Sequence, residues 1–144
     1  MIVDNTLVFS DGQAITADAG STNVIDIGAA GTAFGHAAAV SRDIGKGTEI
    51  PVHVSVTETF TNLTSINIKV QTDDNAGFSS AKTVAQSGEI LLAALVAGYK
   101  FTFPAELPEG TDERYLRLYY DITGTAPDAG KIFAGIVAGR QTNT

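Results

Sequence analysis

The two histidines, His36 and His53, are the side chains best suited to bind a metal or to transfer protons. A metal site built from histidine needs two or three converging ligands. His36 lies in a segment rich in glycine and alanine, whereas His53 lies on the polar side of a strand-like pattern. Since nothing in the sequence brings them together, we favour histidines that face solvent or an interface over a ligand or acid–base role.

Asp73, Asp74 and Asn75 resemble the beginning of a calcium-binding loop. Such a loop also needs a glycine at its sixth position and a glutamate at its twelfth. Those positions hold Phe78 and Val84. The calcium pattern therefore fails, and we predict a hairpin turn in which the Asp and Asn side chains bond to the nearby backbone.

Two pairs of carboxylates, Glu106 with Glu109 and Asp112 with Glu113, have the chemistry that glycoside hydrolysis uses. Both pairs lie in one segment punctuated by proline and glycine, where acidic side chains are usually solvated. The chain has no cysteine and no Gly-x-Ser-x-Gly, P-loop or His-Glu-x-x-His motif. We predict a protein that is not an enzyme, with no catalytic residue, no metal site and no cofactor.

The charge and the hydropathy of the chain argue against nucleic-acid and membrane partners. The chain has 144 residues and a net charge of −7, and its lysines and arginines are scattered singly. Binding to nucleic acid needs a basic face that displaces counterions, so we expect no nucleic-acid partner. The beginning of the chain lacks the features of a signal peptide, and no apolar run is long enough to cross a membrane. We expect no membrane partner and a protein that acts where it is made.

Strands are the elements that must position these side chains. Alternation of apolar and polar residues places one face of a strand on a core and the other toward water. The clear cases are residues 50–56, 65–72, 99–103 and 115–122, and weaker ones are 7–9, 24–27, 83–91 and 131–138. Residues 93–97 are expected to form one helical turn. This pattern predicts one all-β domain over residues 1–144, a jelly-roll β-sandwich of about eight antiparallel strands.

The segment 28–47, rich in glycine and alanine, is unusually long for a connection in a compact domain. Loops of this kind are usually functional or disordered. Phe34 lies within it, and Phe60 and Phe78 lie in or beside other predicted loops. Each aromatic side chain either folds back onto the rim of the core or anchors contacts with a neighbouring chain. Together with His36, these three residues form the candidate protein interface.

Seven short stretches follow one another along the sequence: DNTLVFSDGQAIT (4–16), VIDIG (24–28), RDIGKG (42–47), VQTDDN (70–75), FSS (78–80), LVAGY (95–99) and ERYLRL (113–118). In this order they resemble the capsid cement (decoration) proteins of tailed bacteriophages, of the kind first described on a Bordetella phage. The resemblance implies a jelly roll on the outer surface of the virion capsid, made in the cytoplasm of the host bacterium. It implies two partners, the major capsid protein and the chain itself as a homo-oligomer (dimer or trimer), and a structural role that reinforces joints between capsid subunits.

Three functions therefore stay open at this point. The first is the cement protein, with residues 28–47 and the N-terminal arm as the contacts to the capsid or to a sister subunit. The second is a glycan- or receptor-binding jelly-roll module on the virion or tail. The third is a small hydrolase that uses the acidic loop.

Overall fold

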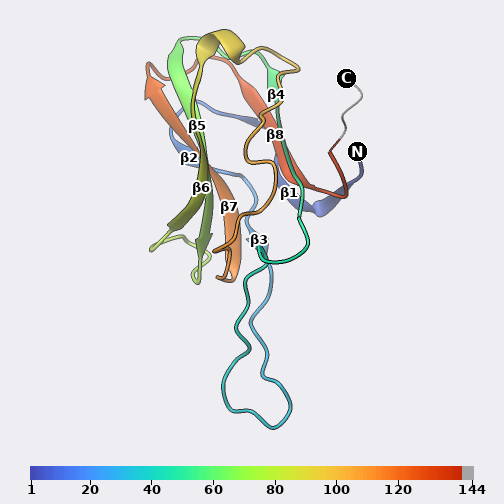
Figure 1. Ribbon diagram of the computed structural model, residues 1–144. Coiled ribbons are helices and arrows are strands. Elements are labelled where there is room, and N and C mark those ends of the chain that lie inside the picture. Colours follow the sequence, from blue (N-terminus) through green and yellow to red (C-terminus); the bar gives the residue numbers. More distant parts are fainter. Residues whose placement is uncertain (141–144) are drawn as a thin grey trace.

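Two antiparallel sheets face each other in the computed structural model, which describes residues 1–140 (Figure 1). The smaller sheet has the order β1 (Val3–Ala14), β8 (Lys131–Val137) and β4 (Val52–Glu58). The larger sheet has the order β2 (Ala19–Gly20), β7 (Tyr115–Gly124), β5 (Leu63–Asp73) and β6 (Lys82–Leu91), and β3 (Ile25–Asp26) also pairs with β7. The predicted all-β sandwich is confirmed, while its jelly-roll connectivity stays a prediction.

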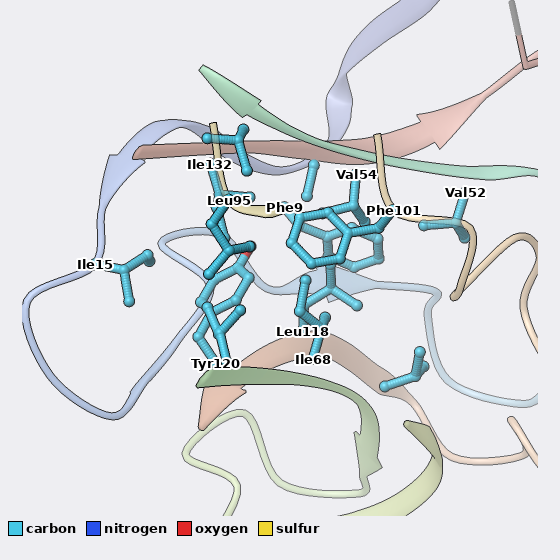
Figure 2. Close-up of a cluster of buried hydrophobic side chains, with 14 of the residues drawn as sticks. Phe9, Ile15, Val52, Val54, Ile68, Leu95, Phe101, Leu118, Tyr120 and Ile132 are labelled. Atoms are coloured by element: carbon cyan, nitrogen blue, oxygen red, sulfur yellow. The ribbon is translucent and has the colours of Figure 1, made fainter. Parts of the chain in front are cut away.

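The long strands bury every second side chain between the two sheets. These buried residues are Val52, Val54 and Val56 of β4, Ile66, Ile68 and Val70 of β5, Leu116, Leu118 and Tyr120 of β7, and Ile132 and Ala134 of β8. Figure 2 shows side chains from both sheets, among them Phe9 and Leu118, meeting in this core. Burial of each valine, leucine or isoleucine side chain among them stabilises the fold by about 1.5–3 kcal/mol, so the core holds the sheets together.

Tyr120 is the largest fully buried side chain, and its hydroxyl needs a partner inside the core. Its Oη lies 2.7 Å from Oγ of Ser10, a buried residue of β1 in the opposite sheet. Burial raises the pKa of Tyr120 above its ordinary value, against a smaller lowering effect of the Ser10 hydrogen bond. The pair is a polar connection between the two layers.

The strand predicted at residues 99–103 is wrong. This part of the chain runs irregularly beside β4, to which it is joined by hydrogen bonds such as Val56 N to Tyr99 O (2.9 Å) and Phe101 N to Val54 O (3.0 Å). Phe101 is nevertheless buried, as its alternation indicated. The chain turns away immediately afterwards, with a cis peptide bond between Phe103 and Pro104.

The predicted helical turn is present one residue early, as the 3-10 helix η1 (Leu92–Ala94). It lies at one end of the sandwich, shown at the top of Figure 1. The connection between β3 and β4 projects from the opposite end. Among residues 1–140, no helix is long and apolar enough to span a membrane.

Candidate protein-interaction arm

Residues 28–47 form a projection that we call the arm, which extends from the sandwich at the bottom of Figure 1. Every residue from 29 to 41 is exposed. The two limbs of the arm are joined by a hydrogen bond from Val40 N to Gly31 O (2.8 Å) and by a β-bridge between Thr32 and Ala39. The arm is therefore a narrow hairpin-like structure whose sides and end all face solvent.

The end of the arm is a four-residue turn, residues 33–36, which we call the tip. It is closed by a hydrogen bond from His36 N to Ala33 O (3.0 Å). Gly35 has a φ of +81°, as the third residue of a type II turn requires. Phe34, the second residue of the turn, is fully exposed. The turn thus presents a fully exposed aromatic side chain near the end of the arm.

Residues 42–46, the root of the arm, are fastened to the loop 108–111. The Asp43 carboxylate accepts hydrogen bonds from Gly45 N (3.0 Å) and from Gly110 N (2.8 Å). Ile44 N donates to Thr111 O (3.1 Å). One carboxylate therefore organises its own turn and joins that turn to a loop far away in the sequence.

Gly45 brings the root and the loop into close contact. A Cβ atom at this position would lie 1.8 Å from the carbonyl oxygen of Pro108 and 2.6 Å from the amide nitrogen of Glu109. Both obstacles are backbone atoms, which cannot rotate away as a side chain would. Glycine is thus the residue that fits this contact.

Arg42 closes the base of the arm from the other side. Its guanidinium donates to Ile27 O (3.0 Å) and to Gly28 O (2.8 Å), so it joins the returning limb to the departing one. With both limbs held at the base, the arm has a defined starting direction.

Charge divides the arm from its surroundings. Residues 28–41 contain no Asp, Glu, Lys or Arg. Three ion pairs lie at or next to the base: Arg114–Asp26 at 2.7 Å, Lys46–Glu109 at 3.1 Å and Lys82–Asp112 at 2.9 Å. In the first, two hydrogen bonds from the guanidinium, together with one from Gly28 N, lower the pKa of Asp26 to about 2. An uncharged projection therefore rises from a charged rim.

The structure separates the four candidate interface residues. Phe34 and His36 lie together at the exposed tip. Phe60 and Phe78 are buried, which is the alternative that the sequence left open for them. Phe78 lies under the guanidinium of Arg117, which is 4.1 Å from the ring centroid. Only the two tip residues have surface to offer a partner.

His53 differs from the expectation of a histidine that faces solvent or an interface. It does point away from the core side of β4, but only 5% of its surface is exposed. Its ring lies 6.2 Å from that of Phe133. Burial lowers the pKa of His53, and the nearby charges of Arg140 and Lys100 lower it further. The neutral form is therefore favoured.

Several acidic residues make structural contacts, whereas Oε2 of Glu113 is buried without a hydrogen-bond partner and burial raises the pKa of that carboxyl. Asp73 accepts hydrogen bonds from Asn75 N (2.9 Å) and from Ser80 N (2.8 Å), as the predicted hairpin turn requires. Burial acts to raise the pKa of Asp73, but these hydrogen bonds outweigh it, and the pKa lies below its ordinary value. Glu109 and Asp112 each have a lysine partner. Within the described part of the chain, no group of three or more His, Asp or Glu side chains could hold a metal ion.

The sequence interpretation missed three residues of the arm. Val40, which is 53% exposed, adds an apolar side chain to the returning limb. Arg42 and Asp43 hold the base, yet their partners are backbone atoms that leave no sequence signal. The only available signal was their place in the stretch RDIGKG.

Comparison with known protein families places the chain among phage proteins. Residues 9–136 match the sequence model of the Bbp16 family, a span that includes the whole arm and its root. No curated protein matches the chain.

Proposed function

The chain belongs to the Bbp16 family, the cement (decoration) protein family of Bordetella phage BPP-1, and from this premise we propose that it binds the outside of an assembled capsid and reinforces the joints between major capsid protein subunits. Membership implies a phage capsid cement protein, a location on the virion capsid and a structural role without enzymatic activity.

The observation that best supports this proposal is the arm. A cement protein works through surface contacts, and the arm offers uncharged, solvent-facing surface from residue 29 to residue 41. Its root is fixed to the sandwich by Asp43 and Arg42. A contact made at the tip therefore transmits load to the body of the protein, as a reinforcing role requires.

Several copies joined together would strengthen such contacts. Tethered binding sites raise one another's effective concentration, so modest contacts give high avidity. We propose that the chain forms a dimer or trimer and that the exposed apolar N-terminal residues, Met1 and Ile2, contribute to contacts between copies. Each oligomer would then hold more than one capsid subunit at a joint.

The test is to add the purified protein to capsids that lack it. Co-sedimentation gives the occupancy, and the temperature at which the shells open gives the reinforcement. We expect saturable binding and a higher opening temperature. A variant that lacks residues 29–41 should show reduced occupancy. Failure of the intact protein to bind would refute the proposal, whereas unchanged occupancy of the deletion variant would refute the role of the arm.

A further inference from the structure

We infer that Phe34 is an aromatic anchor that inserts into an uncharged, apolar recess on the major capsid protein, an inference that rests on the proposed function. The arm is thus the element that contacts the capsid shell. It is not a contact between copies of this chain.

The aromatic side chain at the tip is fully exposed. Phe34 has no contact that shields its ring, whereas every other phenylalanine and tyrosine side chain of residues 1–140 is buried, as Phe9 and Phe101 are, or partly buried. Aromatic side chains supply a large share of the binding energy at interfaces. The residues beside Phe34 are small, with Ala33 before it and Gly35 after it. The ring can therefore enter a narrow recess without obstruction from its neighbours.

The arm is preorganised for binding. The tip turn, the bridge between Thr32 and Ala39, and the fastened root all exist in the isolated chain. A preformed element loses little conformational freedom when it binds, so more of the contact energy appears as affinity. Each limb from base to tip has about six residues, which span at most roughly 20 Å. The arm can thus reach into a surface while the sandwich remains above it.

The surroundings of the arm indicate the kind of partner that it fits. An uncharged arm that rises from a charged base would give an interface with an apolar centre and a polar border, which is the usual anatomy. A second copy of this chain is a poor receptor. Two hollows on residues 1–140 are open to solvent. One is lined by residues 29–31 and 40–43 of the arm itself, including Arg42 and Asp43, and the other by Lys69 and residues 83–86 of the sandwich. Neither has the enclosed apolar walls that a phenyl ring needs, so we place the recess on the shell.

The experiment compares three variants on capsids that lack the protein. Phe34→Ala is expected to weaken binding per copy about 10- to 100-fold, which corresponds to the loss of a buried aromatic side chain. Phe34→Leu should keep part of the affinity. Leu91→Ala is the matched control, because Leu91 is 60% exposed but lies at the other end of the sandwich, and it should bind like the wild type.

A photo-reactive phenylalanine at position 34 identifies the partner directly. We expect a crosslink to the major capsid protein, and an unchanged oligomeric state of Phe34→Ala in analytical ultracentrifugation. A crosslink to a second copy, or a change in oligomeric state, would overturn the inference. If the wild type binds and Phe34→Ala binds equally well, the anchor is refuted and the proposed function stands. If the wild type does not bind, the proposed function fails and the anchor fails with it. Since Phe34 makes no shielding contact, circular dichroism should show that all variants fold and melt alike.

Discussion

Replacing Gly45 by alanine should detach the arm from the body of the protein. The new Cβ would lie 1.8 Å from the carbonyl oxygen of Pro108 and 2.3 Å from its carbonyl carbon. Real Cβ atoms do not approach other atoms so closely, and the obstacle is backbone. The root of the arm must therefore lift away from the loop 108–111.

The cost follows from the contacts that are lost. The hydrogen bond from Ile44 N to Thr111 O contributes about 1 kcal/mol, and the one from Gly110 N to the Asp43 carboxylate about 1.5 kcal/mol or more. We expect a loss of about 2–3 kcal/mol in the free energy of unfolding. For a chain of 144 residues, the unfolding entropy is about 0.3 kcal/mol/K, so the melting temperature should fall by about 7–10 °C.

Gly31→Ala is the matched control for this change. Gly31 lies in the same arm and has no positive φ, and a Cβ atom added there would have no other atom within 4 Å. Alanine there should leave the stability unchanged or raise it by up to about 1 kcal/mol, because it restricts the unfolded chain.

Thermal melting and amide hydrogen exchange measure both effects. In Gly45→Ala, the amides of Ile44 and Gly110 should exchange faster, while amides in the core strands keep their relative protection. Capsid affinity should also fall, since the tip loses its fixed direction. A Gly45→Ala variant that melts with the wild type and keeps both amides protected would refute the reasoning.

Three further predictions concern the sandwich. Arg114→Gln should return the pKa of Asp26 from about 2 toward 3.8, measured by NMR titration, and an unchanged titration would contradict the ion pair. Because the pKa of Asp26 is lower in the folded state, the stabilisation by the ionised carboxylate is present above pH 3.8 and is lost as the pH falls toward 2. Tyr120→Phe should cost about 1 kcal/mol in urea unfolding by removing the bond to Ser10, and a neutral result would deny that this contact joins the layers. Phe9→Ala should cost about 3–5 kcal/mol in the same assay, and a cost below about 1 kcal/mol would argue against a tightly packed core.

The strands were predictable because alternation reports burial directly. Residues 50–56, 65–72 and 115–122 correspond to β4, β5 and β7, whose alternate side chains fill the core. The strand β2 has two residues, too few for any periodicity. The segment 99–103 has a strand-like pattern, but its backbone conformation is set by its hydrogen bonds to β4. Local strand propensity does not encode these contacts.

The candidate site was predictable in place but not in detail. The length and composition of residues 28–47 marked the arm, and the turn chemistry of Gly35 is local. The root depends on contact with residues 108–111, which no local pattern reveals. The same holds for Phe60 and Phe78, whose burial depends on what the fold brings over them. Phe78, for example, is covered by Arg117 of β7.

The most direct test of the central claim is an electron cryomicroscopy reconstruction of capsids to which the purified protein has been added. We predict density for the sandwich on the outer surface, above joints between major capsid protein subunits, with the arm directed into the shell and Phe34 inside an apolar recess. Absence of added density, or density on the inner surface or over the middle of single subunits, would contradict the assignment as a joint-reinforcing cement protein.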